Sequence, residues 1–204
     1  MKNKLKFLFA IFFILLIGVF ICFRADGIVN RTNKPRYQAE EIIREGRTIE
    51  ETNYYKIMES NFLYCCVFYN RQHVVTKIEG PMEKEPRVGM VDEKFVRFTV
   101  QAGTGTGAQW GYYYDPGMDV FSDVFESILD ESDGKVAYSR QNAIVIRDIF
   151  DESKYFKEIT EFENTLSPTV EPFMDVRFTD DGKYVEVTYL TGEDYRETTE
   201  RFAL

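Results

Sequence analysis

A glycine-rich segment offers the most suggestive binding motif of this chain. Gly103, Gly105 and Ala108 formally match the relaxed dinucleotide-binding pattern, and they follow a predicted strand. That pattern requires a helix whose N-terminus faces the pyrophosphate, whereas residues 109–114 are aromatic and favour a strand. A P-loop is excluded because no Gly-Lys-Ser/Thr follows. We therefore predict a hairpin loop in which Gly103, Gly105 and Gly107 are candidate contacts for a partner.

An aromatic cluster follows this loop. On a strand, Trp110, Tyr112 and Tyr114 share one face, because successive side chains alternate. If that face is exposed, it would stack on a sugar or grip a peptide. If it is buried, it belongs to the core, which is the interpretation that we favour. If the face is exposed, the three residues are candidate binding residues.

Nucleophilic and metal-binding side chains are few. His73 is the only histidine, so a zinc site with two histidines from one chain is impossible. A Cys-His pair would need His73 with Cys65 or Cys66, and no Gly-x-Ser-x-Gly elbow is present. We predict a surface histidine at the start of a strand. Adjacent cysteines on a strand point to opposite faces, so we expect one to face inward and one outward.

Acidic residues are abundant, but no spacing singles out a catalytic pair or a metal site. A glycosidase-type carboxylate pair therefore stays open as an alternative. Residues Asp130–Gly134 resemble the start of a calcium-binding loop, but Gly134 arrives one residue early. We interpret this segment as a turn, and we predict neither a metal nor a cofactor.

The N-terminus carries the strongest signal for location. Lys2, Lys4 and Lys6 precede 17 uncharged apolar residues, Phe7–Phe23. As a helix they would span about 26 Å, close to the lower limit for a bilayer core of about 30 Å. No face of the run is polar, which argues against a buried helix of a soluble domain. We predict a transmembrane helix within residues 1–23 that contacts the membrane through residues 7–23.

The residues around the apolar run favour its retention. In Phe23-Arg24-Ala25 the bulky Phe23 stands three positions before the possible cleavage site, where signal cleavage requires a small residue. No small residue stands directly before Cys22, as a lipoprotein signal requires. The lysine-first layout places the N-terminus in the cytoplasm, although four basic residues follow within residues 24–36. We expect a single-pass cell-membrane protein with its C-terminal domain outside. Secretion after signal cleavage is the alternative.

Residues 24–204 form an acidic body. They hold 34 acidic and 22 basic residues, a net charge of −12. This charge argues against nucleic acid as a partner, since phosphates need a basic surface, and it keeps an exported domain soluble. About 180 residues suffice for one core. The abundance of Phe and Tyr favours strands over helices.

The body divides into a short N-terminal region and a β domain. Residues 24–52 are predicted as a linker and a short helix, the helix lying within 37–51, and residues 53–204 as the extracytoplasmic β domain. Strands are predicted at 61–69, 73–78, 94–101, 110–114, 135–139, 143–149, 175–178, 184–189 and 195–204. For residues 151–162 the sequence is compatible with either a strand or a short helix. The fold class is mainly β, an antiparallel meander.

Three similar turns suggest an internal period. Asp92, Asp133 and Asp181 each begin a turn that opens a strand, at spacings of 41 and 48 residues. Such spacing is like that of propeller blades. We favour the simpler interpretation, in which Asp-Gly-Lys is an ordinary hairpin turn, and the body is short for a propeller of at least four blades. Propeller-like hairpin units and a β-sandwich both stay open.

Several segments of the C-terminal half form a recognisable set. They are Gly103–Gly107, Trp110–Asp115, Val145–Glu158, Thr188–Tyr195 and Glu197–Glu200. Together they resemble uncharacterised secreted or membrane-anchored proteins of Gram-positive bacteria, over roughly residues 90–204. The resemblance implies a location outside the cytoplasm and a β fold. It implies no activity, and no catalytic residue is carried over from it.

Three functions follow from these observations, in order of preference. The first is a membrane-tethered, non-enzymatic module that binds an extracellular protein, a peptide or a cell-wall component. The second is a cell-envelope hydrolase that uses paired carboxylates. The third is an accessory subunit of a membrane complex, whose apolar helix packs against other membrane helices.

Overall fold

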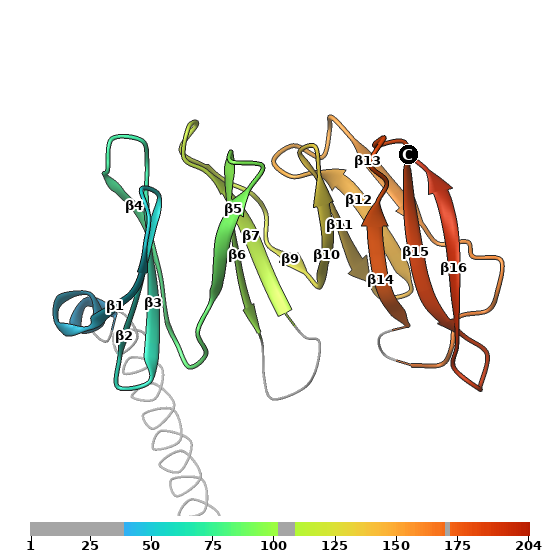
Figure 1. The fold of residues 1–204 in the computed structure, drawn as a ribbon, viewed down its shortest axis with the longest axis horizontal. Helices are drawn as coiled ribbons and strands as arrows, with labels where there is room; N and C mark the ends of the chain where they lie inside the picture. Colours follow the sequence, from blue (N-terminus) through green and yellow to red (C-terminus); the bar gives the residue numbers. More distant parts are fainter. Residues whose placement is uncertain (1–38, 102–108, 170–171) are drawn as a thin grey trace, which may run out of the picture.

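The computed structural model describes residues 39–101, 109–169 and 172–204. Four antiparallel sheets follow one another along the chain, and one short helix lies beside the first of them (Figure 1). The predicted mainly β fold is confirmed. The predicted membrane helix within residues 1–23 lies outside the described residues. Within the described ranges, no helix is both long and apolar enough to span a bilayer.

The first sheet has the strand order β1-β2-β3-β4. Its strands are β1 (Arg47–Glu51), β2 (Tyr55–Ser60), β3 (Leu63–Tyr69) and β4 (Val75–Met82). The helix before it covers residues 39–45 and ends at Gly46, whose N–H donates to the Ile42 carbonyl at 2.8 Å. The expectation of a helix within 37–51 is therefore wrong for residues 47–51, because they pair with β2 as a strand.

The second sheet has the order β5-β6-β7-β8, and β9 also pairs with β7. Its strands are β5 (Arg87–Val91), β6 (Phe95–Gln101), β7 (Gln109–Asp115), β8 (Val120–Phe121) and β9 (Phe125–Glu126). The predicted strands at 94–101 and 110–114 correspond to β6 and β7. The sequence does not predict β5, β8 and β9, because they are short and mix apolar residues with polar residues or glycine.

The third and fourth sheets complete the chain. The third consists of β10 (Ile128–Ser132), β11 (Lys135–Arg140), β12 (Ala143–Asp148) and β13 (Phe156–Ile159), in that order. The fourth consists of β14 (Phe173–Phe178), β15 (Tyr184–Thr191) and β16 (Arg196–Ala203). The segment 151–162, for which a helix and a strand were both open, thus contains the strand β13.

The sheets pack face to face in chain order, and each interface holds its own apolar core (Figure 1). Phe68 and Tyr112 lie between the first and second sheets, and Val136 lies between the second and third. Ile144 and Val187 lie between the third and fourth sheets. The inner sheets are therefore covered on both faces. Since successive side chains of a strand point to opposite faces, a central strand such as β12 has buried residues on both faces.

The two adjacent cysteines occupy opposite faces of β3. Cys66 faces the core between the first and second sheets, and Cys65 packs with Ala39 and Ile42 of the helix. Both are fully buried, so the expectation that one faces outward is wrong, because the helix covers that face. Burial raises the pKa of the Cys65 thiol to about 11 and also raises the pKa of Cys66. Neither is a reactive thiolate at neutral pH.

The three similar turns lie at equivalent places in three successive sheets. Asp92, Asp133 and Asp181 lie in the turns that join β5 to β6, β10 to β11, and β14 to β15. Asp92 has a φ of 51°, Asp133 of 49° and Gly182 of 65°, in the left-handed region that tight hairpin turns use. The period of the sequence therefore marks the first hairpin of the second, third and fourth sheets.

Strand β10 connects the third sheet to both of its neighbours through successive side chains. Asp130 Oδ2 accepts a hydrogen bond from the Phe178 N–H of the fourth sheet at 2.7 Å, and burial raises the pKa of this carboxyl. Glu131 points the other way and accepts hydrogen bonds from Arg97 and Tyr113 of the second sheet. These two carboxylates fix the third sheet against the second and the fourth.

Candidate functional site

A groove lies between the second and third sheets, at the strands β5 and β10. All five residues of β5 line a cavity of about 300 Å³, together with Arg97, Thr99, Gln109 and Glu131. A second cavity of about 320 Å³ shares Arg87, Thr99 and Gln109 with the first. The two cavities are therefore adjacent, and together we call them the β5 groove.

The position of β5 in its sheet creates this groove. Among the described residues, β5 is the edge strand of the second sheet and pairs only with β6. Val88 packs against the core between the first and second sheets, and Val91 against the core between the second and third. Residues that point to both faces thus line the same cavity, which places the cavity along the edge of the strand. At the centre of β5, no atom lies within 4 Å of where a Cβ of Gly89 would be.

Arg97 and Glu131 form a closed ion pair across the groove. Arg97 Nη1 lies 2.8 Å from Oε1 and 2.7 Å from Oε2 of Glu131. The Tyr113 hydroxyl donates to the same Oε2 at 3.1 Å. Burial, and then the nearby charge of Glu131, raise the pKa of Tyr113, so its hydroxyl stays a donor. This pair adds no net charge to the groove.

Arg87 contributes a positive charge that is not neutralised in this way. The residue is exposed, and within the part of the chain that the structure describes its guanidinium has no hydrogen-bond or ion-pair partner. Its backbone carbonyl is held by the Thr99 hydroxyl, which donates to it at 3.3 Å. A guanidinium presents a planar set of donors that matches a carboxylate or a phosphate. Of the two arginines of the groove, Arg87 is therefore the one that suits an anion. Lys84 and Glu85 also line the groove, and their formal charges balance.

The floor of the groove is closed at β7. A Cβ on Gly111 would lie 2.4 Å from the Phe98 carbonyl oxygen, 2.6 Å from Thr99 Cγ2 and 3.2 Å from Ile128 Cδ1. Beside it, Gln109 Nε2 donates to the Ile128 carbonyl at 3.0 Å. The second and third sheets thus meet closely at β7, and the groove opens from there toward β5.

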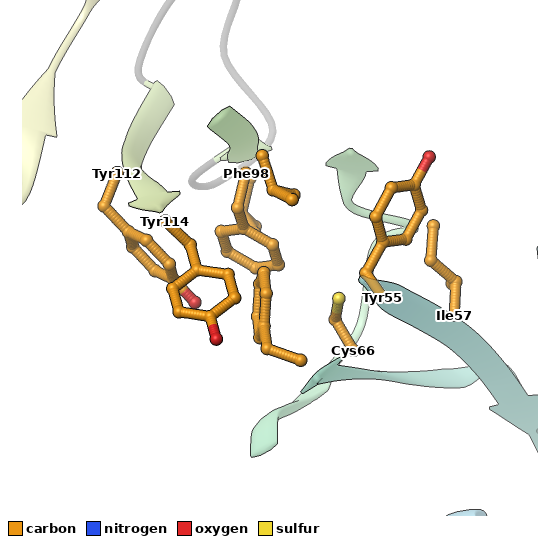
Figure 2. Close-up of a cluster of buried hydrophobic side chains, with 9 residues drawn as sticks. Tyr55, Ile57, Cys66, Phe98, Tyr112 and Tyr114 are labelled. Atoms are coloured by element: carbon orange, nitrogen blue, oxygen red, sulfur yellow. The ribbon is translucent and has the colours of Figure 1, made fainter. Parts of the chain in front are cut away.

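Two of the aromatic residues predicted as candidate binders, Tyr112 and Tyr114, lie in the core between the first and second sheets (Figure 2). Tyr112 and Tyr114 are 1% and 0% exposed, and Trp110 packs against the same cluster. The ring centroids of Tyr112 and Phe98 are 4.9 Å apart, and the Tyr112 hydroxyl donates to Glu79 at 3.0 Å. The first sheet covers the face that a sugar or peptide would need. These rings form core, and a binding role for them stays a prediction.

The predicted glycine contacts, Gly103, Gly105 and Gly107, lie outside the described residues, so their role also stays a prediction. The residues on either side of the loop are described. Gln101 ends β6 and Gln109 begins β7, and both line the β5 groove. The loop therefore joins two strands that border the groove.

Sequence reasoning missed the charged residues of the groove. Arg87 belongs to a strand that the sequence does not predict, and Glu131 lies in a segment interpreted as a turn. The sequence contained one signal that could have indicated the groove, namely the alternation in β6. There Arg97 and Thr99 lie on one face of the strand, and the other face is apolar. Polar side chains on a covered face require a polar partner opposite them.

The other predicted chemical groups are dispersed. His73 is exposed in the turn between β3 and β4, with its ring centroid 5.8 Å from that of Tyr69. Because Cys65 and Cys66 are buried, the described residues contain no cysteine paired with this histidine for nucleophilic attack. The interpretation of Asp130–Gly134 as a turn is confirmed only for Asp133 and Gly134, because the first three residues of the segment belong to β10. No group of three metal-binding side chains occurs among the residues described.

A further cavity, separate from the β5 groove, lies against the fourth sheet and is acidic. It has a volume of about 510 Å³ and is lined by Glu161, Glu163 and Glu200, among other residues. The Glu200 carboxylate accepts a hydrogen bond from the Glu163 N–H at 2.9 Å and another from the Tyr189 hydroxyl. Glu200 is thus held in place by its neighbours, while three carboxylates border one cavity.

Comparisons with known proteins assign no family. No known family model matches the sequence, and curated protein sequences give no match. Among solved structures, the crystal structure of the computationally designed Ika4 protein matches with a TM-score of 0.39 and 11% identity. The match covers 78% of this chain and 92% of that chain. A likeness of this size carries no inference about function.

Proposed function

We propose that this protein is a membrane-tethered, extracytoplasmic β domain that acts as a non-enzymatic binding module, with the β5 groove as its binding site. The observation that carries this proposal is the groove itself, in which the guanidinium of Arg87 lies without a partner among the described residues. The proposed ligand is an extracellular protein, a peptide or a cell-wall component.

The apolar run and the acidic body support the proposed location. Residues 7–23 carry no charge and follow three lysines, and the net charge of residues 24–204 is −12. The resemblance of roughly residues 90–204 to secreted or membrane-anchored proteins agrees with it. Protease added to intact cells should degrade residues 39–204 while a cytoplasmic control protein survives. Protection of both would contradict the outward topology.

We also propose that the four sheets are propeller-like units rather than the two layers of a sandwich. The face-to-face order of four successive meanders supports this arrangement. The outer face of the fourth sheet has the polar character expected at an end of such a row. There Glu186 stands in register between Arg177 and Arg201, and all three are exposed.

Several features support binding over catalysis. The thiols of Cys65 and Cys66 are buried and have a raised pKa, and the single histidine is exposed in a turn. In the groove, the Glu131 carboxylate is engaged by Arg97 and Tyr113, so it does not serve as a free general base. What the groove offers a ligand is a cation, a polar lining and a strand edge.

One observation favours the alternative of a hydrolase. Three glutamates border the acidic cavity at the fourth sheet, and paired carboxylates are the groups that glycosidases use. A hydrolase would release soluble fragments from isolated cell-wall sacculi and would lose this turnover on Glu200→Gln. A binding module retains sacculi without releasing fragments. The accessory-subunit alternative rests on the apolar run alone.

The groove is tested by filling it. Gly89→Leu places a side chain where no atom lies within 4 Å, and Gly89 does not have a positive φ, so the fold should tolerate it. We expect full-length Gly89→Leu protein in detergent to lose at least about 10-fold in retention on sacculi or on random hexapeptides, because the side chain occupies the ligand's volume. Ala203→Leu, on the exposed end of β16, is the control for added bulk. Equal retention by Gly89→Leu and wild type would contradict the proposed site.

A further inference from the structure

The free edge of β5 is the first of three observations that define a ligand for the groove. β5 pairs with β6 along one edge, and no strand among the described residues pairs with its other edge. The Tyr55 hydroxyl reaches the Val88 carbonyl at 3.4 Å and borders this edge on the side of the first sheet. On the side of the third sheet, the groove leaves the edge open. Such an edge is a template for an added strand.

The second observation is the room over one face of β5, next to this edge. Gly89 stands at the middle of the five residues of β5, and nothing lies within 4 Å of its Cβ position. The face of β5 is therefore open at this position, so a strand added at the edge finds room there for a side chain of its own that points to the same face. Five residues at about 3.3 Å each give a contact of about 16 Å. This length suits a short extended peptide.

The third observation is the distribution of charge. Arg97 is neutralised by Glu131, whereas Arg87, at the start of β5, has no partner among the described residues. Residues 24–204 carry a net charge of −12, so the domain repels a ligand with many negative charges. A ligand with a single localised negative charge can pair with Arg87 and is repelled only weakly by the net negative charge of the domain. A peptide supplies such a charge at its C-terminus.

We propose that the β5 groove binds the C-terminal end of an extended peptide, which adds as a strand to the free edge of β5 and places its terminal carboxylate on Arg87. This assignment deepens the proposed binding function and rests on it. Main-chain hydrogen bonds to β5 supply the affinity, and the open space at Gly89 accommodates a side chain of the peptide. The guanidinium of Arg87 distinguishes the C-terminus from the rest of the peptide.

The test uses two pools of fluorescein-labelled hexapeptides of random sequence that lack Asp and Glu. One pool has a free C-terminal carboxylate, and the other is amidated. Binding to the full-length protein in detergent is measured by equilibrium dialysis. We expect wild type to bind the free-carboxylate pool at least about 10-fold more tightly, the size of one charge-assisted contact. Arg87→Ala should abolish this difference, and Gly89→Leu should abolish the binding of both pools.

A control variant separates the carboxylate contact from a general loss of positive charge. Arg177→Ala removes an exposed arginine of the fourth sheet, away from the groove, and should leave the preference intact. Equal binding of the two pools by wild type would overturn the inference. So would an unchanged preference in Arg87→Ala.

The failure of the inference is distinguishable from the failure of the proposed function. If both pools bind equally and Gly89→Leu still abolishes binding, the groove is the site and the carboxylate contact is wrong. If Gly89→Leu binds like wild type, the ligand lies elsewhere and the proposed function itself is contradicted. If wild type binds neither pool, the peptide inference is overturned, and the retention of sacculi decides the function.

Discussion

Replacing Gly111 by alanine should destabilise the domain by about 3 kcal/mol or more, toward the upper end of what overpacking costs. The new Cβ would lie 2.4 Å from the Phe98 carbonyl oxygen and 2.6 Å from Thr99 Cγ2. The carbonyl is backbone of the neighbouring strand β6 and cannot rotate away. On the other side, Ile128 of the third sheet lies at 3.2 Å. The substitution therefore forces β6 and β7 apart within the second sheet and also crowds the third sheet at Ile128.

Urea unfolding of the full-length protein in detergent, followed by the fluorescence of Trp110, measures this effect. Trp110 is the only tryptophan and packs in the core between the first and second sheets. Gly89→Ala is the matched control, because the same change in β5 meets no atom within 4 Å. It should alter the free energy of unfolding by no more than about 0.5 kcal/mol. Similar costs for the two variants would contradict the close approach at β7.

Tyr112→Ala should cost about 4 kcal/mol, as expected when a fully buried aromatic side chain is truncated. The Tyr112 ring is 1% exposed and stacks on Phe98, and its centroid lies 5.9 Å from that of Phe68. Its removal would leave a cavity between the first and second sheets. If Tyr112 were instead an exposed binding residue, the cost would stay within about 0.5 kcal/mol.

Tyr112→Phe separates the ring from its hydroxyl. The variant keeps the packing and loses the hydrogen bond to Glu79, which retains its ion pair with Lys77 at 2.9 Å. We expect a cost of about 1 kcal/mol. Both variants are measured by urea unfolding followed by circular dichroism. A cost for Tyr112→Ala no greater than that for Tyr112→Phe would show that the ring is not part of a packed core.

The sequence is most informative where a strand is covered on both faces or closes a clear hairpin. The run Ala143-Ile144-Val145-Ile146 and the last hairpin, β15 and β16, are examples. The sequence does not predict the strands β5 and β10, because Gly89 and the acidic residues of β10 weaken the apolar pattern. Their strand character comes from neighbours that are distant in the sequence, as tertiary contacts override local propensity.

The site was harder to predict than the fold. The alternation of Trp110, Tyr112 and Tyr114 gives a shared face, but periodicity does not say whether another sheet covers it. The burial of Cys65 likewise depends on the helix at residues 39–45, which the local pattern of β3 does not contain. The groove arises from the gap between two sheets, and Arg87 and Glu131 come together there from segments 44 residues apart. No local motif encodes that proximity.

Hydrogen exchange of the β5 amides tests most directly the claim that this edge binds a ligand. The full-length protein in detergent is followed by mass spectrometry with and without the free-carboxylate hexapeptide pool. We predict that residues 87–91 exchange more slowly in the presence of the peptides, since an added strand protects backbone amides. Unchanged exchange at residues 87–91, with slowing at the acidic cavity around residues 199–202, would contradict the account.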